Sequence, residues 1–182
     1  MGEYVSSFKD RIIRAARLDA QLYEEVEADK SSINQALAVV ILSSLAGSLN
    51  IGQLGVSGIF IGVVITLTGW IVWAYVTYLI GTKLLPESQT ESSFTELLRT
   101  IGFSSSPGLI RIVGIVPFIS GPVFFITSIW MLVAMVIAVR QALDYKSTKR
   151  AVGVCVIGWV FQLVVMYVMF SLLVESAAKS FN

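Results

Sequence analysis

The stretch Ser57–Thr82, SGIFIGVVITLTGWIVWAYVTYLIGT, decides the fold of this chain, because it contains no charged residue. It is longer than the ~20 residues that a helix needs to cross a ~30 Å hydrocarbon core. Four further apolar stretches cover residues 33–52, 105–119, 121–139 and 152–174. The sequence therefore predicts an all-α fold, a polytopic transmembrane bundle of five spans that occupies residues 31–182.

The composition agrees with a membrane protein and limits its chemistry. Of 182 residues, 55% are hydrophobic and only 14% are charged, which is too little charge to solvate a soluble domain of this size. A net charge of +1 gives no basic field for nucleic acid. Without histidine there is no Ser–His pair and no ordinary zinc site, and we expect no enzymatic activity, metal or cofactor.

Residues 1–30 form a polar head with a helical pattern. Apolar residues recur every three or four positions, and they are Phe8, Ile12, Ala15, Leu18, Leu22 and Val26. Asp19 is a suitable N-cap for a second helix, which separates a basic first half from an acidic second half. The basic half either lies on an anionic leaflet or packs on the bundle as a solvated amphipathic helix; both interpretations are open.

The distribution of basic residues predicts the orientation. Eleven of the 13 Lys and Arg lie in the head, in the linker 83–99 and in the loop 140–150, whereas the loops 50–56 and 117–122 contain none. By the positive-inside rule, the N-terminus is cytoplasmic and the C-terminus is outside, and we expect the cell membrane. The third stretch is short enough to be a re-entrant segment, but that would place the basic loop 140–150 outside, so a full crossing is favoured.

Two capping boxes are predicted at helix starts, Ser32 with Gln35 and Ser93 with Glu96.

The start of the third stretch is a candidate anion site. Ser106 suits the N-cap and Pro107 the first helical position, and the N-terminus of such a helix, together with Arg99 and Arg111, would bind a lipid phosphate. Arg111 is the ionisable residue well inside the apolar region, which makes it a functional candidate. Alternatively, it lies one turn past Pro107 and reaches the cytoplasmic headgroups.

Four residues have candidate structural roles. Arg140 and Asp144 are four positions apart, which allows an ion pair on one helix face. Gly58 and Gly62 form a GxxxG pattern that permits close helix contact, either within one chain or in a homo-oligomer.

Several motifs together resemble one family. They are Leu22–Asp29 (LYEEVEAD), Glu96–Phe103 (ELLRTIGF), Ser106–Leu109 (SPGL), Ile115–Pro117 (IVP), Trp130–Met135 (WMLVAM), Ala138–Tyr145 (AVRQALDY) and Thr148–Val152 (TKRAV). The chain resembles the prokaryotic members of the Yip (Ypt-interacting protein) family. The resemblance implies a five-helix membrane domain with a cytoplasmic N-terminus. Eukaryotic members contact Rab-type GTPases in vesicle traffic, but their Asp-Leu-Tyr-Gly-Pro stretch has no match here.

The expected function is therefore non-enzymatic. Tyr23, Glu24, Glu25 and Glu27 are the candidate contacts for an unknown protein partner at the cytoplasmic face. Membrane lipids, including anionic ones, are the other expected partners, and the protein would bind its partner or organise the bilayer. The alternative is a small-solute transporter or channel that uses the broken third span beside a cavity.

Overall fold

The structure is a computed structural model that describes residues 6–48, 55–116 and 118–180. Its described residues form helices and connecting turns, without strands. In chain order the elements are α1 (Phe8–Ala16), α2 (Ala20–Ala28), η1 (Lys30–Ser32), α3 (Ile33–Ser48), α4 (Gly55–Leu79), η3 (Ile80–Leu84), α5 (Phe94–Phe103), η4 (Ser106–Ile115), α6 (Ser120–Ala142) and α7 (Thr148–Ser180). η1 and η4 are 3₁₀ helices and η3 is a short π-helix.

The head is two helices, as the position of Asp19 predicts. The Asp19 side chain accepts the N–H of Gln21 at 3.0 Å and caps α2. Leu18 has a φ of 63°, and the N–H of Asp19 returns to the Arg14 carbonyl, which ends α1 in a Schellman turn. Ala15, Leu22 and other members of the predicted apolar face are fully buried, so the head packs on the bundle.

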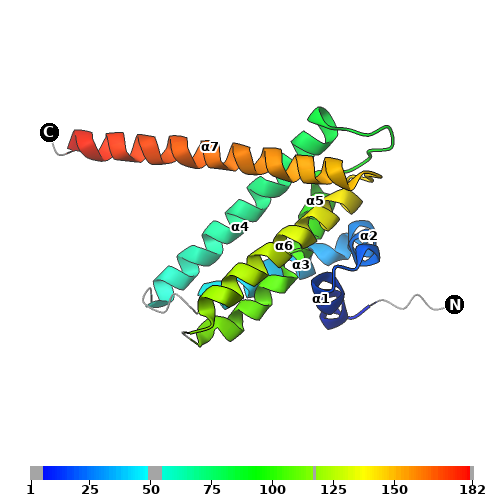
Figure 1. The fold of residues 1–182 in the computed structure, drawn as a ribbon, viewed down its shortest axis with the longest axis horizontal. Coiled ribbons are helices and arrows are strands. Elements are labelled where there is room, and N and C mark those ends of the chain that lie inside the picture. The colour runs from blue at the N-terminus through cyan, green and yellow to red at the C-terminus, as the bar shows by residue number, and fades with distance from the viewer. Residues whose placement is uncertain (1–5, 49–54, 117, 181–182) are drawn as a thin grey trace.

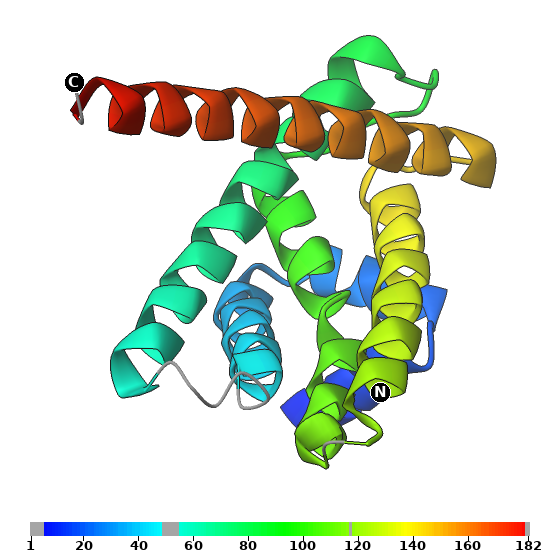
Figure 2. The same ribbon diagram turned by 60° about the vertical axis from the view of Figure 1, so that its left-hand side comes forward.

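Four described segments are long and apolar enough to cross a membrane: Lys30–Ser48, Ser57–Leu84, Ser120–Ala142 and Thr148–Val165. The third predicted stretch, 105–119, is not among them, because its helical part is the ten-residue 3₁₀ helix η4. Figures 1 and 2 show that α5 and η4 follow one another along the bundle. Together they lead from the linker that follows η3 to the turn before α6. The α7 C-terminal end lies at the opposite end of the molecule from α1 and α2 (Figure 1).

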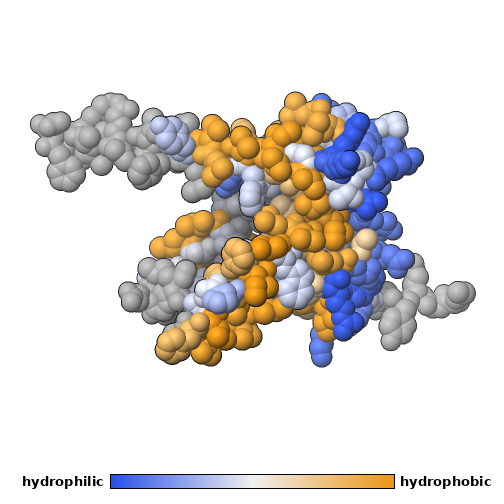
Figure 3. All heavy atoms as spheres, viewed as in Figure 1, coloured by the Kyte–Doolittle hydropathy of each residue, from blue (hydrophilic) through white to orange (hydrophobic). Residues whose placement is uncertain are grey.

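Polar and apolar residues are separated along the same direction. Figure 3 shows hydrophilic residues gathered at the end of the molecule that carries the head, and apolar residues over most of the helices beyond it. Large apolar side chains such as Phe60, Phe125 and Phe161 are more than half exposed, which is expected where lipid replaces water.

Small residues let α3 lie close to its neighbours. A Cβ on Gly102 of α5 would lie 2.8 Å from the Cβ of Ala36, and a Cβ on Gly108 of η4 would collide with Ser43 Oγ. Gly62 of α4 faces Ser48 Oγ, at 3.5 Å from the position of an added Cβ. This position of Gly62 fits close packing of α3 and α4 within one chain. Small residues commonly allow such close helix contacts in membrane bundles.

The end of α6 differs from the prediction. Asp144 has a φ of 52° and Tyr145 N–H bonds to the Arg140 carbonyl, which is a second Schellman turn. The spacing would allow an Arg140–Asp144 ion pair only if the helix continued, and α6 ends at Ala142, before Asp144. Arg140 instead donates its Nε–H to the Tyr145 carbonyl at 3.2 Å. The Tyr145 hydroxyl lies 2.7 Å from the Leu85 carbonyl oxygen, which fixes the linker against this turn.

One of the two predicted capping boxes forms. Ser93 and Glu96 make both reciprocal bonds at the start of α5. Ser32 instead donates its hydroxyl to the Val26 carbonyl at 2.8 Å, and Gln35 accepts from Arg11.

Candidate functional site: a polar cavity at Arg111

Arg111 projects from η4 toward hydroxyl groups of α6. Its Nε donates to Thr127 Oγ1 at 3.2 Å and its Nη2 to Ser128 Oγ at 3.1 Å. The guanidinium also lies 5.1 Å from the centre of the Phe124 ring, within the range of a cation–π contact. The sequence has no Asp or Glu in residues 30–86 or 97–143.

Contacts with α3 and α6 define the position of Arg111 along the bundle. Its Cδ and Nη1 lie 3.9 Å from the position of a Cβ on Gly47, one residue before the end of α3. Arg111 therefore lies beside the C-terminal part of α3. The head reaches the same region, because Trp130 of α6, two residues after Ser128, donates its Nε1–H to the Ala16 carbonyl of α1 at 2.8 Å.

A cavity of about 370 Å³ lies beside Arg111, between α3, α4, η4 and α6. Its polar lining consists of Arg111, Ser43, Ser44, Ser48, Thr66 and Ser105. Ser44 Oγ and Thr66 Oγ1 are 3.1 Å apart, which joins the α3 and α4 walls. The Ser44, Ser48 and Thr66 hydroxyls donate within the structure, to Thr66 Oγ1, the Ser44 carbonyl and the Gly62 carbonyl. The guanidinium is a fork of charged N–H donors, which suits an anionic oxygen group.

The other residues of the predicted anion site lie elsewhere. Arg99 is 5% exposed, and it donates Nε–H to the Val26 carbonyl at 3.0 Å and an Nη2–H to the Glu27 carbonyl. It thus compensates the carbonyl end of α2, where a cation is favourable, and the expectation that it shares a site with Arg111 is wrong. Pro107 lies in the first turn of η4, but the cap position is Ser105 rather than Ser106. Ser106 is 2% exposed, and its Oγ has no hydrogen-bond partner among the residues that the structure describes.

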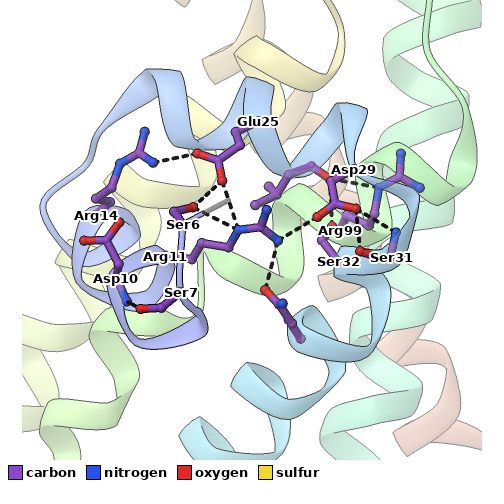
Figure 4. Close-up of polar contacts among 12 residues, drawn as sticks. Ser6, Ser7, Asp10, Arg11, Arg14, Glu25, Asp29, Ser31, Ser32 and Arg99 are labelled. Atoms are coloured by element: carbon purple, nitrogen blue, oxygen red, sulfur yellow. Dashed lines mark hydrogen bonds and ion pairs between the residues drawn. The ribbon is translucent and has the colours of Figure 1, made fainter. Parts of the chain in front are cut away.

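The head is held together by Arg11, which is 3% exposed (Figure 4). Its guanidinium pairs with Glu25 Oε1 at 3.0 Å and with Asp29 Oδ2 at 2.8 Å. It also donates to Ser6 Oγ at 3.2 Å and to Gln35 Oε1 at 3.0 Å. One basic residue of α1 therefore joins the acidic α2 to the start of α3.

The neighbouring carboxylates are stabilised in their charged forms. Burial raises the pKa of Glu25, but bonds from Ser6, Arg14 and Arg11 outweigh it, so that the pKa lies below its usual value. The bond from the Ser31 side chain, together with Arg11, holds the pKa of Asp29 below its usual value. Because α1 is paired in this way, the structure favours the interpretation in which the head packs on the bundle.

The four predicted partner contacts have different environments. Tyr23 is fully buried, so it packs the core and is not presented to a partner, which corrects the sequence interpretation. Glu25 is occupied by Arg11 and Arg14. Glu24 is exposed and accepts from Gln141 Nε2 at 2.7 Å.

Glu27 is partly buried where α2 meets α5 and the end of α6. Burial raises its pKa to about 8, and the negative charges of Asp144, Glu96 and Glu24 add to this, while Arg99 opposes it. Within the described residues, no group of three or more His, Cys, Asp or Glu is arranged to hold a metal ion.

The hydroxyl wall of the cavity is the part of the site that sequence reasoning missed. Ser44 and Ser48 are four positions apart on α3, and Thr127 and Ser128 lie within an otherwise apolar α6. Hydroxyls in apolar helices usually bond back to their own backbone, as Ser48, Thr127 and Ser128 do here, so they give no distinct signal.

The comparison with protein families gives a match over most of the chain. The family model described as Yip1 domain matches residues 23–169. No curated protein and no solved structure matched the chain. The matched range begins inside α2 and includes α3 to α6 and much of α7, so it contains every element that lines the cavity. With its apolar helices and this match, the chain is an integral membrane protein that belongs to the Yip1 domain family.

Proposed function

We propose that this protein is a non-enzymatic, bilayer-organising membrane protein that binds an anionic lipid headgroup at Arg111. The observation that supports this most directly is the cavity in which a guanidinium and five hydroxyl side chains face a common space. A guanidinium binds phosphate oxygens through charge-assisted hydrogen bonds. A cation at membrane depth usually faces a polar cavity or a partner, which fits this location.

The proposal includes five crossings, with a cytoplasmic head formed by residues 1–30, a C-terminus outside and residence in the cell membrane. The ten residues of α5 rise about 15 Å at 1.5 Å per residue, and the ten of η4 about 20 Å at 2.0 Å per residue. Together they match the ~30 Å hydrocarbon core, which supports a complete third crossing that neither element makes alone. The predicted charge bias then places the basic loops with the head.

The topology is tested with reporters fused before Met1 and after Asn182. Opposite sides are expected for an odd number of crossings. Reporters on the same side would contradict the proposed topology.

The lipid site is tested with Arg111→Leu and Arg111→Lys. Purified variants are analysed for co-purified anionic phospholipid by mass spectrometry. We expect Arg111→Leu to lose the anionic lipid, whereas Arg111→Lys keeps part of it, because lysine preserves the charge but not the fork of donors. Arg17→Leu, an exposed arginine of the head, is the control and should leave the lipid content unchanged. Unchanged lipid in Arg111→Leu would remove the proposal.

A second candidate function is a small-solute carrier or channel, and the irregular η4 beside the cavity favours it. Non-helical or broken segments at membrane depth commonly line such paths. Flux measurements in liposomes separate the two functions: selective uptake supports the carrier, and its absence together with retained lipid supports the lipid-binding protein.

The head remains a proposed contact for a protein partner, with Glu24 as its exposed carboxylate among the four predicted residues. Cross-linking pull-down with the full chain and with a chain lacking residues 1–30 tests this. A partner retained equally by both chains would exclude the head as its binding element.

A further inference from the structure

The cavity at Arg111 continues into a second cavity along α4. The second cavity has a volume of about 360 Å³, and the two share Val40, Thr66, Ser105 and Met131 in their linings. They therefore form one groove with two different ends, which we call the α4 groove. It runs from Gly62 at the Arg111 end to Trp73 at the other end.

The two ends differ in chemistry. The first contains the guanidinium and the hydroxyls described above. The second has a largely apolar lining with five large aromatic and thioether side chains, which are Trp70, Trp73, Met131, Met135 and Trp159. Its polar lining residues are Thr66, Ser104, Ser105 and Gln162, and none of the described residues that line it is charged. A ligand that fits both ends has an anionic group joined to an apolar chain.

The length of the groove also matches one half of a bilayer. Gly62 and Trp73 are eleven residues apart on α4, which corresponds to about 16 Å at 1.5 Å per residue. One leaflet contributes half of the ~30 Å hydrocarbon core, or about 15 Å.

We propose that the α4 groove binds one acyl chain of an anionic phospholipid, with the lipid phosphate at Arg111. This rests on the proposed function and specifies its ligand as a phospholipid that is held by chain and headgroup together. A free phosphate would use the first end of the groove alone. Met131 and Met135 suit this role, because unbranched thioether side chains adapt to an irregular apolar chain.

Gly69 provides a way to block the groove without disturbing the fold. It lines the apolar part, and a Cβ there meets nothing within 4 Å. Gly69→Leu therefore fills space that the acyl chain would occupy. Gly121, at the start of α6, has equally open surroundings and lines neither cavity, so Gly121→Leu is a matched control.

The experiment uses the full chain in phosphatidylcholine vesicles that contain a minor fraction of phosphatidylglycerol with brominated acyl chains. Bromine quenches tryptophan at contact, and three of the four tryptophans line the groove. Brominated phosphatidylcholine at the same fraction measures quenching by ordinary surrounding lipid. The excess quenching by the anionic lipid over this reference reports occupation of the groove.

We expect the parent chain and Gly121→Leu to show the excess, and Gly69→Leu and Arg111→Leu to lose it. Inorganic phosphate added to the parent vesicles should not reduce the excess, because it lacks the chain. If a folded Gly69→Leu variant keeps the excess quenching, the groove proposal is overturned. If the leucine variant does not fold, Gly69→Val replaces it as a smaller obstruction of the groove. If Arg111→Leu loses the co-purified anionic lipid and Gly69→Leu keeps it, the groove proposal is refuted while the headgroup site at Arg111 stands. Unchanged lipid content in Arg111→Leu would refute both.

Discussion

Replacing Arg11 by methionine should loosen the head from the membrane domain. Arg11 is nearly inaccessible and joins Glu25 and Asp29 of the head to Gln35 of α3. Methionine keeps much of the apolar stem but removes the charge and the donors. The prediction concerns local opening of α1 and α2, because the Arg11 bonds join these two helices to one another and to the start of α3.

The magnitude follows from the exposure of the partners. Breaking a fully buried ion pair costs ~3–5 kcal/mol, whereas exposed pairs are worth ~0–1 kcal/mol. Here the arginine side chain is 3% exposed, but the carboxylates of Glu25 and Asp29 are 31% and 27% exposed. Each carboxylate also keeps another partner, Arg14 or Ser31. We therefore expect a loss of about 2 kcal/mol, which is about a 30-fold increase in the opening equilibrium.

Hydrogen exchange of the α1 and α2 amides, measured on the protein in lipid nanodiscs, tests this value. Exchange should accelerate about 30-fold in the head, where exchange follows local opening, and remain unchanged in α4 and α6. Arg17→Met changes an exposed arginine in the same part of the head and should have no effect. If the α1 and α2 amides are equally protected from exchange in the Arg11 variant and in the parent chain, the ion pairs do not hold the head in place.

Further predictions concern titration, packing and the linker. The pKa of Glu27 is raised to about 8 in the folded head, so between about pH 4.5 and 8 the docked head binds a proton that the undocked head has lost. Docking of the head should therefore weaken as the pH rises through this range. Hydrogen exchange of the head amides measures this dependence, and Glu27→Gln should abolish it. Gly102→Ala should lower the thermal midpoint, with a cost of about 1–3 kcal/mol, because its Cβ would lie 2.8 Å from that of Ala36, whereas Gly69→Ala should not lower it. Tyr145→Phe should increase proteolysis of the linker 85–93, because the hydroxyl bond to the linker backbone is lost at a cost of about 1 kcal/mol.

Local sequence signals predicted the helix boundaries correctly where neighbouring residues satisfy one another's hydrogen-bonding groups. Asp19 caps α2, and Ser93 with Glu96 forms the expected capping box, because each bond joins groups within three residues. The Ser32–Gln35 pattern is equally good locally, but it does not form. Both side chains find partners in the head, which no local rule includes.

The membrane character, the helical class and the apolar face of the head were determined by the sequence itself, since hydrophobic length and periodicity act within one segment. The surroundings of the single charges were decided by the tertiary structure. Arg99 and Arg111 are twelve residues apart, yet one compensates the carbonyl end of α2 and the other lines a cavity between α3, α4 and α6. Their environments come from segments far away in the chain, because a cation in an apolar region is stabilised by whichever oxygen atoms packing brings to it.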